Sequence, residues 1–151
     1  MITNTSRTLA FAFAATLALG AVGGAANTDA IKERQDAMSG VQDAMRSLAA
    51  IAKGEAPFDA AVVQKSAASI AEHLDEASRL FPEGSGEGDV ETWAKPEIWS
   101  NYSDFEMKME GAQVAADAMK SVTDEAGFKA AMGKLGGACR ACHTDYRRPK
   151  Q

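Results

Sequence analysis

Apolar residues recur at intervals of three and four along most of this chain, which is the spacing of amphipathic helices. The pattern is most regular over 29–53 and 59–81. In the first stretch the apolar positions are Ile31, Met38, Val41, Met45, Leu48 and Ala52. In the second they are Val63, Ala67, Ile70, Leu74, Ala77 and Phe81. Each pattern predicts a helix that buries one apolar stripe.

Glycine, proline and capping residues separate these elements. Gly54 is expected to close the first helix, and Asp59 is expected to cap the second. Pro82 ends the second helix because proline cannot continue it. Residues 82–95 contain three glycines and four acidic side chains, a composition that predicts a surface loop.

Two more helices are expected after this loop, at about 100–120 and from 124 to about 147. Thr123 is expected to cap the last helix, with Asp124 and Glu125 in its first turn complementing the helix dipole. Short connections make the first two helices antiparallel neighbours, and likewise the last two. The prediction is an all-α protein, an antiparallel four-helix bundle that buries four apolar stripes together.

The N-terminal residues have the pattern of a secretory signal. Arg7 precedes an apolar stretch over 9–19, and the small residues 23–26 follow. The apolar stretch is too short for a membrane span, so residues 1–26 are interpreted as a signal peptide and 27–151 as one mature domain. An uncleaved membrane anchor is the alternative. Export to the periplasm, with no membrane span in the mature chain, is the expected localisation.

Composition narrows the functional classes. With 151 residues and 46% hydrophobic content, the chain is long enough for one domain with a core. Its 21 acidic and 16 basic residues give a net charge of −5. Because no basic cluster stands out, we expect no nucleic-acid partner.

One motif near the C-terminus carries specific chemistry: Cys139-Arg140-Ala141-Cys142-His143. C-x-x-C-H is typical of covalent haem attachment, and on a helix its Cys and His residues share one face. Each thiol would join one vinyl group, and the imidazole of His143 would reach the iron from the same side. A dithiol redox pair would normally follow a strand, a disulfide would not need the histidine, and zinc would need more ligands than two Cys and two His. The prediction is one covalent haem c.

The whole mature chain resembles the class II cytochromes c, the cytochrome c′ family. The segments that carry the resemblance are Ala30–Gln35, Lys53–Asp59, Pro96–Trp99 and Leu135–Arg147, together with the C-terminal position of the haem motif. In this family the residue opposite the proximal histidine divides the members. Cytochromes c′ have an apolar residue there and five-coordinate, high-spin iron, whereas a low-spin branch has a methionine from the first helix.

The resemblance places Met38 at this distal position, where a thioether would raise the reduction potential. Met38 as simple core filler is the alternative, since methionine packs irregular gaps readily. The resemblance further implies that Arg34 lies near the haem propionates and that Trp99 packs near the haem. Gln35, beside Arg34, is a candidate for the haem edge, and Arg147, one turn after His143, is a candidate to lie beside the imidazole. For each of these four, an ordinary surface or core role remains open.

Two functions follow from the two ligation states. With His143 and Met38 as axial ligands, the protein is expected to be a one-electron carrier that meets other periplasmic redox proteins. With an open distal site, it is expected to bind nitric oxide or carbon monoxide. No acid–base pair or nucleophile argues for an enzyme, and a homodimer through the first two helices is left open.

Overall fold

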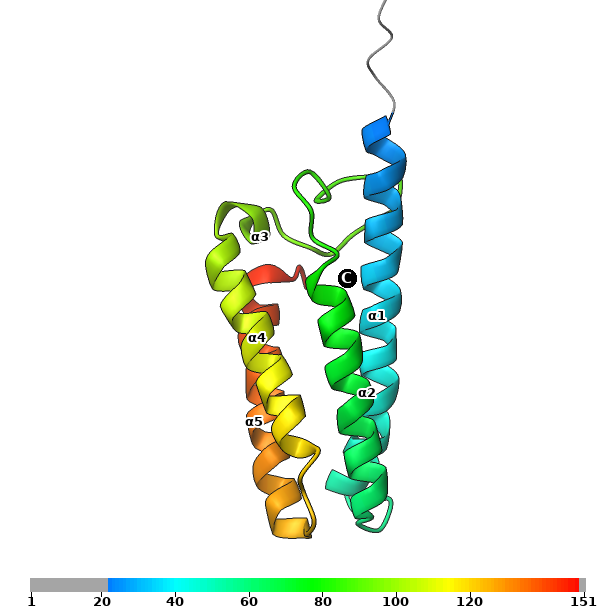
Figure 1. The fold of residues 1–151 in the computed structure, drawn as a ribbon, viewed down its shortest axis with the longest axis vertical. Coiled ribbons are helices and arrows are strands. Elements are labelled where there is room, and N and C mark those ends of the chain that lie inside the picture. Colours follow the sequence, from blue (N-terminus) through cyan, green and yellow to red (C-terminus); the bar gives the residue numbers. More distant parts are fainter. Residues whose placement is uncertain (1–21, 150–151) are drawn as a thin grey trace, which may run out of the picture.

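The computed structural model describes residues 22–149, and this part of the chain is helical. Its helices are α1 (Val22–Ala52), α2 (Ala60–Ser78), α3 (Glu97–Ser100), α4 (Tyr102–Met119) and α5 (Glu125–Tyr146). Within this range there is no strand, and the only β pairing is an isolated antiparallel bridge between Ala94 and Arg147. The four long helices form the predicted bundle, and α3 is a single turn that leads into α4 (Figure 1).

The helices are arranged as two pairs. Figure 1 shows α1 beside α2 and α4 beside α5, with the loop between α2 and α3 crossing one end of the bundle. Packing joins α1 to α2, α2 to α4 and α4 to α5, whereas α1 and α5 make few direct contacts. We call the face between α1 and α5 the α1–α5 seam.

The predicted apolar stripes form the core, with differences at their edges. Five of the six predicted positions of α2 are buried, and Phe81 is half-buried. In α1, Ile31, Val41 and Leu48 are buried, whereas Met38 and Met45 are only half-buried. The prediction that Ala52 is buried was wrong: it is exposed, because the chain turns away at the end of α1.

Aspartate caps mark where α2 and α5 begin. Asp59 caps α2 as predicted, and its carboxylate accepts hydrogen bonds from the amides of Ala61 (2.8 Å) and Val62 (3.1 Å). The prediction of Thr123 as the last cap was wrong. Asp124 is the cap of α5, where its carboxylate accepts the amide proton of Gly127 at 2.8 Å. A carboxylate there satisfies a free amide and also complements the helix dipole.

The N-terminal boundary differs from the expected one. We predicted a helix from about residue 29, but α1 begins at Val22. Most of the predicted signal peptide, residues 1–21, lies outside the described residues. The cleavage site therefore stays a prediction. Within the described part of the chain, none of the helices combines the length and hydropathy that a membrane crossing requires.

Candidate functional site

The cysteines and the histidine of the motif lie together in the last turns of α5. Cys139 is half-buried, Cys142 is buried with 7% of its surface exposed, and His143 is exposed. The i, i+3, i+4 spacing puts all three on one side of the helix, as predicted. Cys139 and Cys142 form no disulfide with each other.

The two thiols are not activated for dithiol redox chemistry. Burial raises the pKa of Cys142 to about 11 and also raises the pKa of Cys139 above its usual value. A redox-active cysteine pair needs the opposite shift, because the thiolate is the reactive form. The motif therefore fits covalent attachment better than disulfide exchange.

The surroundings of His143 shift its pKa in the direction that favours metal binding. Although part of the ring faces solvent, the protein packed behind it lowers the pKa of His143, and the positive charge of Arg147 adds to this shift. A lowered pKa favours the neutral imidazole at neutral pH. Neutral imidazole is the metal-binding state of histidine.

The contacts of Asp145 show which way His143 lies. Residues two apart on a helix point about 160° away from each other. Asp145 forms an ion pair with Lys108 of α4, so this side of α5 faces α4. His143, two residues earlier, therefore lies on the edge of α5 that is turned away from α4 and toward the α1–α5 seam.

The same argument places Met38 on α1. A β-carbon at Gly40 would lie 2.3 Å from Nε2 of His73, so this side of α1 lies directly against α2. Met38, two residues earlier, lies on the opposite edge of the buried stripe, toward the same seam. It is half-buried and packs against the core. The structure thus brings Met38 and His143 to one face of the bundle, on two different helices.

The glycines before the motif also fit a bound group at the seam. A β-carbon at Gly136 or Gly137 would have nothing within 4 Å, so neither glycine is required for packing against another helix. Gly136 is seven residues before His143, which places the two on the same side of α5. Two thiols and an imidazole whose pKa values are shifted toward their neutral forms, together with an uncrowded glycine on the same helix face, fit covalently bound haem.

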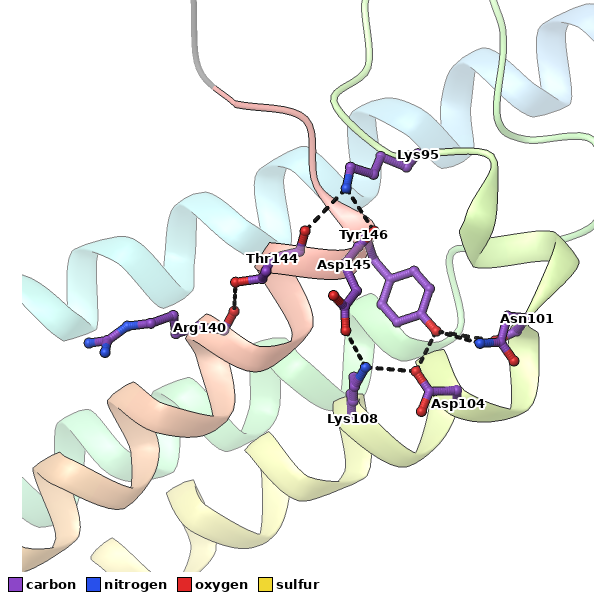
Figure 2. A network of polar contacts seen from close by, with 8 residues as sticks. All are labelled: Lys95, Asn101, Asp104, Lys108, Arg140, Thr144, Asp145 and Tyr146. Atoms are coloured by element: carbon purple, nitrogen blue, oxygen red, sulfur yellow. Dashed lines mark hydrogen bonds and ion pairs between the residues drawn. The ribbon is translucent and has the colours of Figure 1, made fainter.

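A polar network holds the α4–α5 side of the motif, as Figure 2 shows. The buried hydroxyl of Tyr146 donates to the carboxylate of Asp104, which pairs with Lys108 at 2.8 Å. Lys108 also contacts Asp145. The ring of Tyr146 packs edge-on against Phe105 of α4, with centroids 5.3 Å apart. These contacts anchor the helix turn that follows His143.

Arg34 is buried, and it binds protein oxygens. Only 3% of its surface is exposed, and its guanidinium donates to the backbone oxygens of Leu80 (3.4 Å) and Ser85 (2.8 Å). It also donates to the hydroxyls of Ser85 (3.2 Å) and Thr92 (2.9 Å). The guanidinium lies 5.0 Å above the ring of Phe81. Arg34 therefore organises the loop over 82–95, whose Ser85 and Thr92 are buried.

The other predicted site residues lie around this loop. Trp99 is half-buried and donates its indole proton to Pro82 O at 2.9 Å, with Arg34 5.8 Å above its ring. Gln35 is exposed and donates to Glu91 O at 2.8 Å. Arg147 lies 4.8 Å over the ring of Trp93. Each of these side chains is placed by the loop or the C-terminal end, and their contact with haem stays a prediction.

Several contributors were missed by the sequence analysis. Lys95 donates from Nζ to Thr144 O (3.1 Å) and Asp145 O (2.9 Å), the carbonyls that end α5 (Figure 2). Thr92 receives a hydrogen bond from Arg34 of α1. Both residues lie in the loop interpreted only as a glycine-rich surface segment. The spacing of Asp104 and Lys108 at i, i+4 was a signal for a helical ion pair, but not for its contact with α5.

Comparisons with known proteins agree with the resemblance found in the sequence. The profile of one family, described as cytochrome c′, matches residues 29–147. A cytochrome c′ of Rhodopseudomonas palustris is 40% identical over 126 residues, which cover 83% of this chain and 86% of that protein. A cytochrome c-556 of Agrobacterium fabrum is 38% identical over 122 residues, covering 80% and 82%. The solved structure of Rhodopseudomonas palustris cytochrome c′ superimposes with a TM-score of 0.76 at 38% identity, covering 82% of this chain and 98% of that one.

Proposed function

Because the chain belongs to the cytochrome c′ family, whose members bind haem c covalently, we propose that it is a periplasmic one-electron carrier. In this proposal Cys139 and Cys142 form the thioether links, His143 is the proximal ligand and Met38 is the sixth ligand. Relatives named cytochrome c′ and cytochrome c-556 are about equally similar in sequence, so the ligand assignment rests on this chain's own residues.

The observation that carries the proposal is the common orientation of Met38 and His143. The α2 contact at Gly40 and the α4 contact at Asp145 turn both side chains toward the α1–α5 seam. Met38 is also only half-buried, although it lies beside the buried Ile31 and Val41 on the apolar stripe. A thioether at this place is available to a group bound at the seam.

The chain's residues then have separate roles in electron transfer. Haem c supplies the one-electron change between ferric and ferrous iron. His143 and Met38 would hold the iron in both oxidation states, so little of the protein would have to reorganise. A neutral imidazole and a neutral thioether add no charge to the site, and a thioether favours the ferrous state.

The experiment compares the haem-loaded mature chain with Met38→Leu and Met45→Leu. Leucine keeps most of the side-chain volume and removes the sulfur, so packing changes little. Met45 is the matched control because it lies seven residues further along the same stripe and is also half-buried. The unsubstituted protein should be low-spin with a sulfur-to-iron charge-transfer band, which is lost in Met38→Leu and kept in Met45→Leu.

The opposite result has a defined meaning. If the unsubstituted protein is high-spin, five-coordinate and binds carbon monoxide rapidly, Met38 is not a ligand. The chain is then a gas binder of the cytochrome c′ kind. If the charge-transfer band is lost in Met45→Leu instead, a methionine ligates the iron but its assignment to Met38 is wrong.

Export is part of the proposal. Residues 1–26 have the composition of a signal peptide, and haem c is attached after export. Mass spectrometry of the protein purified from periplasmic extracts should show a chain that begins near residue 27 and carries one haem. Recovery of a full-length chain in the membrane fraction would contradict this.

A further inference from the structure

The loop segment 91–95, which we call the strap, connects α1 with α5 across the end of the α1–α5 seam. These two helices make few direct contacts. They carry Met38 and His143, so whatever sets their separation also sets the relation between the two proposed ligands. Figure 1 shows the loop between α2 and α3 lying at the same end of the bundle as the C-terminal end of α5, drawn in red.

The first end of the strap is fixed to α1. Nη2 of Arg34 donates to the hydroxyl of Thr92 at 2.9 Å, and Nε2 of Gln35 donates to Glu91 O at 2.8 Å. Arg34 precedes Met38 by four residues, which is one helical turn. The guanidinium charge makes the hydrogen bonds of Arg34 charge-assisted, and the burial of this side chain shields them from water.

The other end is fixed to the residues after His143 by backbone pairing. The amide of Lys95 donates to Tyr146 O at 3.0 Å, and the amide of Arg148 donates to Trp93 O at 2.8 Å. Ala94 and Arg147 form an antiparallel bridge between these two hydrogen bonds.

The side chain of Lys95 strengthens this end. Its ammonium group donates to Thr144 O and Asp145 O (Figure 2). The last carbonyls of a helix have no partner within the helix, and a cation there also complements the dipole. The strap therefore holds α5 one turn beyond His143, as it holds α1 one turn before Met38.

We propose that the strap sets the separation of α1 and α5, with Thr92 and Lys95 as positioning residues for the Met38 ligand. This inference rests on the proposed ligation by Met38. Inside the strap, Thr92 Oγ1 also accepts the amide proton of Ala94 at 3.2 Å, so the residue that binds α1 is coupled to the segment that pairs with α5. The strap is then one mechanical unit, and weakening either end relaxes the same constraint.

The test uses the haem-loaded variants Thr92→Val and Lys95→Met, singly and together. Thr92→Val keeps the shape and removes the acceptor for Arg34. Each single variant should raise the carbon monoxide affinity of the reduced protein about tenfold, because a charge-assisted hydrogen bond that opposes displacement of Met38 is lost. The double variant should bind carbon monoxide no more tightly than the stronger single variant. The two effects are not additive, because both substitutions relax the same constraint.

Controls separate the strap from general destabilisation. Thr92→Ser keeps the hydroxyl and should behave like the unsubstituted protein. Lys129→Met removes an exposed lysine that is paired with Glu125 elsewhere on α5, and should leave the carbon monoxide affinity unchanged. If the unsubstituted protein is low-spin but neither strap variant changes this affinity, the strap inference is overturned while the proposed function stands.

A second readout does not depend on Met38. Hydrogen exchange of the Arg148 amide reports the α5 end of the strap, and Thr92→Val breaks the α1 end. If the unsubstituted protein proves high-spin, the assignment of Met38 as ligand fails. The hydrogen-exchange measurement at Arg148 then tests the strap inference on its own. Faster exchange at Arg148 in Thr92→Val supports one mechanical unit, whereas unchanged protection shows that the two ends are independent.

Discussion

α5 meets its two neighbours in the bundle in different ways. Toward α4 it packs extensively and adds the network of Tyr146, Asp104 and Lys108. Toward α1 it makes few direct contacts, and the strap supplies hydrogen bonds at one end. The α4–α5 contact is therefore extensive, whereas α1 and α5 are linked through the strap at the end where the motif lies.

This difference separates two properties of the site. Cys139, Cys142 and His143 lie on one helix that is packed firmly against α4, so their mutual geometry depends on that pair. The position of Met38 relative to them depends on α1, which reaches α5 through other elements. Substitutions in the α4–α5 contact should therefore change stability, and substitutions around the seam should change ligation.

The first prediction tests the α4–α5 contact with Phe105→Ala. Phe105 is 3% exposed, and its ring lies 4.7 Å from that of Phe81 and 5.3 Å from that of Tyr146. Removing a buried phenylalanine ring should lower the free energy of unfolding by about 3–5 kcal/mol. Urea denaturation of the haem-loaded protein, followed by circular dichroism, measures the loss.

The same variant should keep the unsubstituted haem spectrum in the absence of urea, because Phe105 lies on the α4 side of α5. A change of spin state in Phe105→Ala without urea would contradict the separation between stability and ligation.

The second prediction concerns the end of α5 that is far from the motif. Asp124→Ala removes the cap that accepts the amide proton of Gly127, which should cost about 1 kcal/mol of stability. Asp59→Ala, the matched change at the start of α2, should cost a similar amount. Thermal or urea unfolding measures both variants, and neither should alter the haem spectrum. A cap variant that changes the spectrum would show that the whole length of α5, and not its last turns, determines ligation.

The sequence predicted the features that local patterns determine. Apolar spacing gave the long helices, Asp59 was found as a cap, and the haem motif was located on the last helix. Met38 was placed opposite His143 by the family resemblance, and the structure brings both residues to one face. The cap was misplaced at Thr123 because Thr123 and Asp124 are adjacent and both have capping side chains. The local backbone conformation decides between them.

The strap could not be predicted because its contacts join residues far apart in the chain. Arg34 and Thr92 are 58 positions apart, and Lys95 and Asp145 are 50 apart. The loop composition indicated only a turn-rich segment, since glycine and acidic residues are common in exposed loops. The sequence alone did not show that Ser85 and Thr92 would be buried against a charged arginine.

The third prediction tests which side of α5 faces the haem, by replacing glycines on different sides of this helix with alanine. A β-carbon added at Gly133, Gly136 or Gly137 would meet no other part of the protein within 4 Å. Glycine inside a helix costs about 0.5–1 kcal/mol relative to alanine, so Gly133→Ala and Gly137→Ala should each stabilise the haem-loaded protein by that amount. Gly136→Ala should not, because Gly136 lies on the side of His143, where haem is expected. Equal stabilisation by all three would place the haem elsewhere on α5.

The smallest predicted effect is a pH dependence from the network between α4 and α5. The hydrogen bond to the Asp104 carboxylate, with burial as a further cause, raises the pKa of Tyr146 from 10.0 to about 12. Because the folded pKa lies above the unfolded one, the contribution to stability is complete below pH 10 and is lost as pH rises through about 12. Tyr146→Phe lacks the ionising hydroxyl, so the difference in unfolding free energy between it and the unsubstituted protein should shrink over this range.

At the acidic end the same pair should respond in the opposite direction. The hydrogen bonds from Lys108 and then from Tyr146 lower the pKa of Asp104 below 3.8, so its contribution is lost only as pH falls below that value.

In the alkaline comparison with Tyr146→Phe, the other ionising groups, such as lysines, are common to both proteins and cancel in the difference. A difference between the unsubstituted protein and Tyr146→Phe that stays constant from pH 9 to about 12 would show that the hydroxyl does not link α4 to α5. The anchoring of the turn after His143 would then rest on ring packing against Phe105 and on the strap.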